Sequence, residues 1–241
     1  MTGGTVMVAV PCRSQIGATA FEALTLSMLK GADWWKRTRG QDAKFGLCVI
    51  ARAHIVDARL EILKQALVNG ADYVWWLDDD MTPPPDTLER LFAAMESTGA
   101  ALAGALCFRR GTPYSPCAFT GESDPITGKP YCVRPDPPRI AAASATGFAC
   151  LLMDVKKAGD VWDHTGGAPF IYKKGMGEDA YYCANARAVG QKIVVDTGLV
   201  PGHIGEIDYN RTFFDSVSKM DPKVLECFEP IPAEAMPRNS A

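Results

Sequence analysis

The chain has 241 residues and a mass of 26.0 kDa, which is enough for one α/β domain with a full core. Its composition, 47% hydrophobic and 22% charged, is that of an ordinary globular protein, and no apolar run is long enough to cross a bilayer, so we expect no membrane insertion. The net charge of -3 gives no general positive field for a nucleic-acid backbone. The N-terminal stretch has neither a basic start nor a small-residue cleavage site, which predicts a cytoplasmic protein.

The chain contains eight cysteines. Four of them lie in apolar segments where we expect buried, reduced thiols rather than disulfides: Cys48, Cys107, Cys150 and Cys183. The chain has no CxxC pair, and the nearest cluster (Cys107, Cys117 and Cys132) lacks the close spacing of a zinc site.

Strand-like and helix-like patterns alternate along the first half of the chain. Strands are expected at 5–11, 45–51, 73–77 and 100–108, and helices at about 21–29, 55–68 and 86–97. The segment 109–139 is rich in Gly, Pro and Ser and predicts loops and short hairpins. A strand at 141–153, a helix at 178–189 and a strand at 192–196 follow, and the chain beyond Asp215 shows little periodicity. This alternation predicts a layered α/β domain.

Three aspartates, Asp78, Asp79 and Asp80, follow the apolar run 73–77 directly. A continuous apolar run predicts a central strand covered on both faces, and ligands of open α/β sheets bind outside the carboxyl ends of such strands. Strand alternation would point Asp78 and Asp80 to one side, where a metal and a ribose could share one pocket. A solvated turn or a helix cap explains the run equally well when it is considered alone, and the preceding strand favours the functional interpretation.

Four segments then occur in an order that resembles GT-A glycosyltransferases, in particular family 2. They are Ala58-Arg59 with 70–81 and Pro83, the stretch 147–153 (GFACLLM), Gly177-Glu178-Asp179 with the helix after it, and 200–205 (VPGHIG). The resemblance covers about 6–205. It implies a Rossmann-like three-layer α/β/α sandwich with a mostly parallel central sheet. It also implies a single domain over 1–241, with a nucleotide-binding half at 1–108, an acceptor and metal-histidine half at 109–214 and a tail at 215–241.

The resemblance also assigns roles at the donor site. Asp80 and His203 would bind a divalent metal, Mn or else Mg, while Asp78 would face the ribose or base, with Asp79 beside it. Arg59 would reach the nucleobase or a phosphate, and Gly147 would begin the segment that lines the donor sugar and acceptor. Pro11 and Arg13, at the end of the first strand, would border the base pocket. A loop histidine and a surface salt bridge are the alternatives for His203 and Arg59.

Asp179 is the candidate general base, with Glu178 as the alternative, because both lie in the first turn of a helix whose dipole favours an ionised carboxylate. Acidic residues also occupy that turn simply to stabilise helices.

We therefore expect a metal-dependent transferase that moves a sugar from a nucleotide-sugar donor, such as a UDP-sugar, to an acceptor hydroxyl, with inversion preferred over retention. The acceptor could be a saccharide, a protein, a small molecule or, with less support, a modified DNA base. A nucleotidyltransferase that makes sugar nucleotides and a non-catalytic nucleotide- or glycan-binding module are the alternatives. The segment 10–17 is a poor triphosphate loop, which disfavours the first of these.

Overall fold

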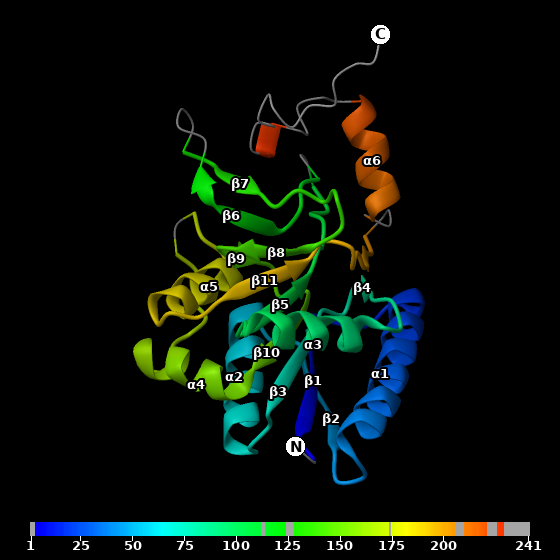
Figure 1. Cartoon of the computed structure of the whole chain (residues 1–241), viewed down its shortest axis with the longest axis vertical. Helices are drawn as coiled ribbons and strands as arrows, with labels where there is room; N and C mark the ends of the chain where they lie inside the picture. The colour runs from blue at the N-terminus through cyan, green and yellow to red at the C-terminus, as the bar shows by residue number, and fades with distance from the viewer. Residues whose placement is uncertain are drawn as a thin grey trace.

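A computed structural model describes residues 3–111, 114–123, 128–173, 175–205, 210–220 and 226–228. Its centre is a seven-stranded sheet (Figure 1). In spatial order the strands are β2 (Lys44–Ala51), β1 (Thr5–Cys12), β3 (Tyr73–Leu77), β10 (Cys150–Asp154), β5 (Leu102–Ala105), β11 (Ile193–Asp196) and β8 (Ile140–Ala143). β10 and β8 run antiparallel to their neighbours, whereas β2, β1 and β3 pair in parallel, as do β5 and β11. The expected mostly parallel α/β sheet is confirmed.

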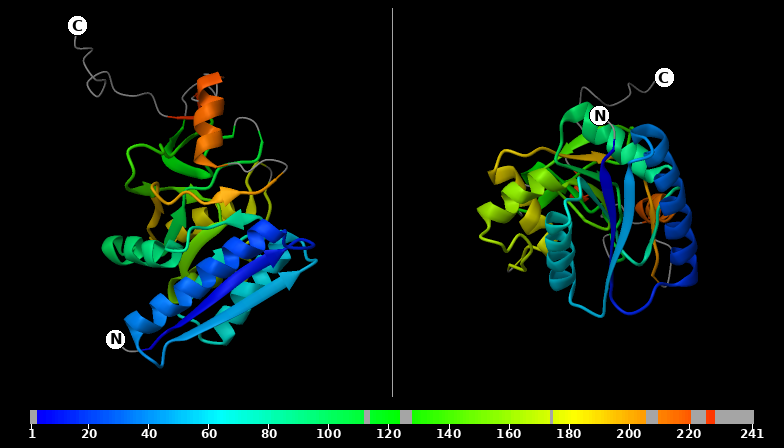
Figure 2. Two further views of the ribbon diagram at one scale, coloured as in Figure 1. Left: turned by 90° about the vertical axis from the view of Figure 1, so that its right-hand side faces the viewer. Right: turned by 90° about the horizontal axis from the view of Figure 1, so that it is seen from below.

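Helices cover both faces of this sheet. α1 (Ala18–Arg39) and α3 (Thr87–Thr98) pack on one face, and α2 (Ile55–Val68), α4 (Val155–His164) and α5 (Glu178–Ala188) pack on the other (Figure 2). Strand side chains alternate between these two cores: Trp75 belongs to the α1 and α3 side, and Trp76 to the α2, α4 and α5 side. Both tryptophans are fully buried, so the apolar run before the aspartates is a central strand, as predicted.

Two small sheets lie beside the main one. β12 (Gly202–His203) pairs with β4 (Met81–Thr82), and β6 (Ala118–Ser123) lies between β7 (Pro130–Cys132) and β9 (Ala145–Thr146). α6 (Arg211–Met220) packs through Phe214 against a third cluster that includes Phe108 and Phe228. In Figure 1, β6, β7 and α6 lie at the end of the molecule away from the N-terminus. α6 continues past Asp215, where the sequence suggested that a tail begins, and the final stretch 229–241 lies outside the described residues.

The expected single strand at 141–153 is wrong, because this stretch forms three strands, β8, β9 and β10, in two different sheets. β10 is buried, whereas β8 and β9 are only partly buried. Small and apolar residues continue through the breaks between the three strands, so periodicity does not reveal them. β9 lies close to the main sheet where a Cβ added at Gly104 would approach the Thr146 hydroxyl to 3.0 Å. α4 was not predicted from the sequence. Its first turn is capped by the Asp154 side chain, which accepts from the Lys157 backbone N–H at 3.0 Å.

All eight cysteines are free thiols. Cys107, Cys150 and Cys183 are buried as expected, but Cys48 is only half-buried. It lies on β2, the edge strand, where alternate residues face solvent. Across the described ranges, no helix is both long and apolar enough to cross a bilayer.

Candidate functional site

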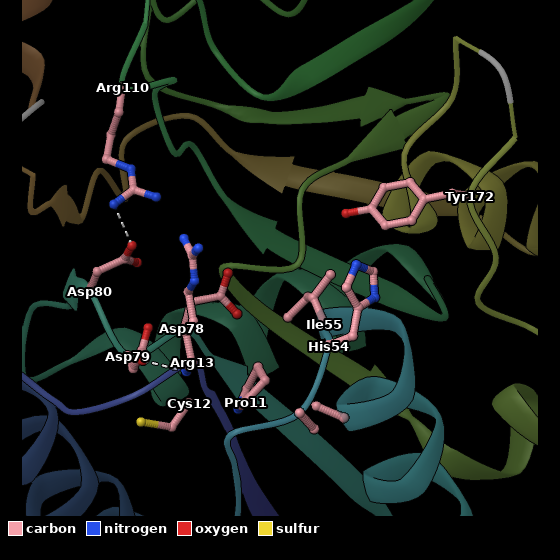
Figure 3. A pocket seen from close by; sticks show the side chains of 12 residues that line it. Pro11, Cys12, Arg13, His54, Ile55, Asp78, Asp79, Asp80, Arg110 and Tyr172 are labelled. Atoms are coloured by element: carbon pink, nitrogen blue, oxygen red, sulfur yellow. Dashed lines mark hydrogen bonds and ion pairs between the residues drawn. The ribbon is translucent and has the colours of Figure 1, made fainter.

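A cavity of about 480 Å³ opens at the carboxyl ends of β1, β2 and β3. A volume of this size suits a small-molecule ligand. Five residues singled out from the sequence line it: Pro11, Arg13, Asp78, Asp79 and Asp80. In Figure 3, Arg110 and Tyr172 lie on opposite sides of this cavity, and the Asp80 carboxylate points to Arg110. Parallel strands thus bring segments that are far apart in the sequence to one edge, as expected for such sheets.

The three aspartates do not continue the strand. β3 ends at Leu77, and the Met81 backbone N–H closes a turn by donating to the Asp78 carbonyl at 3.2 Å. The side chains consequently do not alternate across a sheet, and all three line the cavity. Asp79 accepts from the Arg13 backbone N–H at 2.9 Å, which fastens the end of β1 to this turn. This contact gives Asp79 a structural partner that strand alternation did not foresee.

Asp80 lies where β4 pairs with β12. The Ile204 backbone N–H donates to the Asp80 carbonyl at 2.7 Å, and this pairing brings His203 beside the Asp80 side chain. His203 Nε2 is 3.3 Å from Asp80 Oδ1, and Arg110 Nη1 is 2.7 Å from Asp80 Oδ2. Burial raises the pKa of Asp80, but the hydrogen bond and charge of His203, together with the charge of Arg110, outweigh burial, so the pKa falls below its usual value.

His203 presents its Nε2 lone pair to this site when it is neutral. Its Nδ1 lies 2.9 Å from the Phe108 carbonyl, which can only accept, so Nδ1 must carry the hydrogen. Burial lowers the pKa of His203, but the Asp80 carboxylate outweighs burial and raises the pKa above its usual value. Asp80 Oδ1 is buried, and it has no hydrogen-bond partner when His203 is neutral with its hydrogen on Nδ1. Nitrogen and oxygen lone pairs that face each other fit a cation between them.

The protein ligands for such a cation are few. Within the described residues, no cluster of three or more His, Cys, Asp or Glu side chains could hold a metal ion. Asp80 and His203 would therefore supply two ligands, and the remaining positions would have to be filled by water or by oxygens of a bound ligand. Such an open coordination sphere is what a metal needs in order to bind and polarise a substrate.

Arg59 lies beneath the cavity instead of lining it. Its side chain is 3% exposed and donates to both oxygens of Asp78, at 3.2 and 3.3 Å, and to Glu178 at 3.3 Å. The guanidinium also stacks near the Trp76 and Phe148 rings. It is therefore not the surface salt bridge that was its alternative interpretation. Burial raises the pKa of Asp78 even though Arg59 opposes this shift.

The Gly177-Glu178-Asp179 segment begins α5, as predicted. Glu178 is buried against Arg59, whereas Asp179 is half-buried and accepts from its neighbour, the Ala180 backbone N–H, at 2.7 Å. Burial and the charge of Glu178 raise the pKa of Asp179. Gly147 lies close by, because a Cβ added there would be 3.7 Å from Asp179 Oδ2 and 3.3 Å from Cys117.

The family model described as Glycosyl transferase family 2 matches residues 41–150, which contain α2, β3, the three aspartates and β10 as far as its first residue. The chain is a glycosyltransferase of the GT-A fold, similar to family 2.

Solved structures agree with this fold. The structure of A197 from STIV superposes with a TM-score of 0.53 and 13% sequence identity, over 86% of this chain and 87% of that one. The structure of GalNAc-T7 with UDP, GalNAc and Mn2+ gives a TM-score of 0.55 and 12% identity, over 83% of this glycosyltransferase but only 43% of GalNAc-T7. No curated protein matches the sequence. At these identities the structural matches support the fold alone.

The geometry groups the predicted site residues of this glycosyltransferase into three sets. Pro11, Arg13 and the three aspartates line the cavity. His203 adjoins it through Asp80, and Arg59 with Glu178 lies behind Asp78. Asp179 and Gly147 lie together on the Glu178 side.

Other residues that line the cavity were missed, including Cys12, His54, Arg110 and Tyr172. His54 directly precedes α2 and follows β2, so its position at the carboxyl end of a strand was the available signal. Its ring contacts Tyr172 edge-on, with 5.6 Å between the centroids. Arg110 and Tyr172 come from loops, for which periodicity offers no signal.

Proposed function

We propose that this enzyme transfers a sugar from a nucleotide-sugar donor, a UDP-sugar, to an acceptor hydroxyl with inversion, and that it requires Mn or Mg. The observation that carries the proposal is the arrangement of Asp80 and His203 at the edge of the cavity. A buried carboxylate oxygen without a hydrogen-bond partner faces the imidazole Nε2 at 3.3 Å, and a divalent cation would satisfy both atoms. The UDP and Mn2+ in the GalNAc-T7 structure support the same choice of donor and ion.

The donor would lie along the edge of the sheet. Pro11, Arg13 and His54 border the part of the cavity at the ends of β1 and β2, which suits a nucleobase, and Asp78 and Asp79 suit a ribose. The diphosphate would then reach Asp80, where a bound cation would neutralise the leaving diphosphate. Arg59 holds Asp78 in place from below and so would act as a positioning residue for the ribose contact.

Asp179 would accept the proton of the acceptor hydroxyl as that oxygen attacks the anomeric carbon. A carboxylate whose pKa is raised by burial is a stronger base near neutral pH than one in water. Glu178 suits this role less well because it is buried in an ion pair with Arg59. A side chain at position 147 would crowd Cys117, since an added Cβ would lie 3.3 Å from the Cys117 side chain, and it would contact Asp179 Oδ2 at 3.7 Å.

The decisive experiment is a thermal-shift panel of nucleoside diphosphates and sugar nucleotides, with and without Mn, on the wild type and Asp80→Asn. A ligand at a hundred times its Kd stabilises the native state by about 2.7 kcal/mol, which raises the Tm of a chain of this size by about 5–10 °C. We expect a Mn-dependent shift with one sugar nucleotide that Asp80→Asn abolishes. Equal shifts with and without Mn would refute the metal requirement, and no shift with any nucleotide would refute the donor site.

The cellular setting and the acceptor belong to the proposal as well. Eight free thiols suit a reducing compartment, which supports the cytoplasm. The loops and hairpin at 109–139 border the Asp179 side through Cys117 and are the segment in which we expect acceptor contacts. Saccharides, proteins and small molecules should be tried first as acceptors.

A further inference from the structure

The positively charged Arg110 lies beside Asp80, a residue that is proposed to bind a metal cation. Its guanidinium lies at the rim of the cavity, 2.7 Å from Asp80 Oδ2, on the carboxylate expected to bind the metal. The same Nη1 atom donates to the Ile204 carbonyl at 3.1 Å. Asp80 thus has a cation on one oxygen and the His203 nitrogen on the other.

The ion pair between Arg110 and Asp80 can be broken at little cost in free energy. The Arg110 side chain is 47% exposed, in contrast to Arg59, which is 3% exposed and fixed between Asp78 and Glu178. An ion pair whose arginine is half-exposed contributes little net free energy, because water solvates the guanidinium well after the two groups separate. A divalent cation between Asp80 Oδ1 and His203 would repel the guanidinium on Oδ2, and this repulsion can release Arg110 from Asp80.

The displaced guanidinium would have a new partner when a donor is bound. Arg110 lines the same cavity as the nucleotide-facing residues, on the side opposite Tyr172 (Figure 3). A diphosphate that reaches the metal at Asp80 would lie within the span of this side chain, and an arginine fork pairs well with phosphate oxygens.

We propose that Arg110 is a second cationic group of the donor site: it neutralises Asp80 before metal binds and pairs with the donor diphosphate once the metal has replaced it. The inference rests on the proposed metal site at Asp80 and His203. Arg110 thereby competes with the metal in the absence of donor and assists donor binding in its presence. These two effects have opposite signs, which makes them separable from a simple structural role.

The test uses the full chain and two binding measurements that need no turnover. Mn2+ binding without nucleotide is followed by the electron paramagnetic resonance signal of free Mn2+, and UDP binding with saturating Mn2+ is measured by calorimetry. In Arg110→Ala we expect Mn2+ to bind about two- to fivefold more tightly, the range of a competing half-exposed ion pair. UDP should bind about tenfold more weakly, because a charge-assisted hydrogen bond to phosphate is lost.

Arg109→Ala is the matched control, since it removes the same charge from the adjacent exposed position. We expect it to leave both affinities unchanged, and Arg110→Lys to lie between the wild type and Arg110→Ala in UDP binding. Weaker Mn2+ binding in Arg110→Ala would mean that Arg110 merely supports the Asp80 region, which overturns the inference. Unchanged affinities for both ligands would also overturn it.

Asp80→Asn separates failure of the inference from failure of the proposed function. If the wild type binds Mn2+ and Asp80→Asn does not, the metal site stands and the Arg110 results decide the inference. If neither binds Mn2+ even with UDP present, the proposed metal site is wrong, and the proposed role of Arg110 is wrong as well.

Discussion

The carboxyl group of Asp179 is less well solvated than a carboxyl group in water. This should affect both the stability of the protein and the reactivity of the carboxyl group. Its pKa is raised by burial and by the charge of Glu178. The folded state therefore holds the proton more tightly than the unfolded state does. This group favours folding at low pH, and the contribution is lost as the pH rises through its folded pKa.

We predict that Asp179→Asn loses transfer activity and gains stability at neutral pH. Removal of a general base should lower kcat by about 10²–10⁴-fold. Removal of an unfavourable buried charge should raise the Tm at pH 7, and the gain should shrink at acid pH, where Asp179 is protonated in the wild type. Rates and melting curves between pH 4 and 8 measure both effects.

Glu178→Gln serves as the comparison for Asp179. If Glu178→Gln loses as much activity as Asp179→Asn while donor affinity stays constant, the base assignment moves to Glu178. The acidic limb of the wild-type rate profile should also lie above the usual range of an aspartate pKa, and it should be absent from the residual activity of Asp179→Asn.

The positions of site residues could be predicted from the sequence where those residues follow the end of a strand. Asp78, Asp79, Asp80, Pro11 and Arg13 line one cavity because parallel strands end at one edge. The burial of Arg59 was not predictable, because it depends on Glu178, which is 119 residues away in sequence, and on two aromatic rings that pack around the guanidinium. Arg110 and Tyr172 reach the cavity from irregular segments, whose paths no periodicity encodes.

At the level of elements, the two-residue strand β12 holds His203 beside Asp80. It pairs with β4 directly after the aspartate turn, with His203 opposite Met81 and the Ile204 backbone N–H on the Asp80 carbonyl at 2.7 Å. Both proposed metal ligands are thus fixed to each other through main-chain hydrogen bonds.

We predict that Ile204→Pro weakens metal binding without altering either ligand. Proline removes the N–H that donates to Asp80, so β12 loses the bond that keeps His203 at the carboxylate. Mn2+ affinity should fall by about tenfold, as expected for loss of support around a metal ligand. Ile204→Ala keeps the N–H and should retain wild-type affinity, and a similar loss in both variants would implicate the side chain instead.

Most elements were predicted with the correct type because their patterns are local. α2 and β3 have the predicted bounds, since each combines a clear period with a clear end signal. The stretch 141–153 was misread as one strand because small and apolar residues continue through the breaks between β8, β9 and β10, which belong to two different sheets. α4 was missed because it follows β10 without an intervening turn, and its start is marked by a single capping aspartate.

At the scale of the whole molecule, Arg59 joins three separate elements through buried ion pairs. It lies on α2 and pairs with Asp78 after β3 and with Glu178 at the start of α5. Loss of one partner of a buried ion pair leaves the other charges without compensation and costs about 3–5 kcal/mol.

We predict that Arg59→Met lowers the Tm by on the order of 10 °C, given about 2–4 °C per kcal/mol for a chain of this length. The double variant Arg59→Met with Glu178→Gln should recover part of this loss, because fewer unpaired charges stay buried. Thermal denaturation followed by circular dichroism measures both. A Tm within 2 °C of the wild type in Arg59→Met would show that water reaches these carboxylates.

The position of β10 has a consequence for any attempt to divide the chain. β10 belongs to the second half of the sequence, yet it lies between β3 and β5 of the first half, hydrogen-bonded to both. A polypeptide that ended at residue 108 would carry every aspartate of the cavity but would lack the middle strand of its own sheet. The boundary predicted at residue 108 between a nucleotide-binding half and an acceptor half is therefore not a boundary for folding. Fragments cut there should regain structure only when they are mixed, as complementing pieces of one protein.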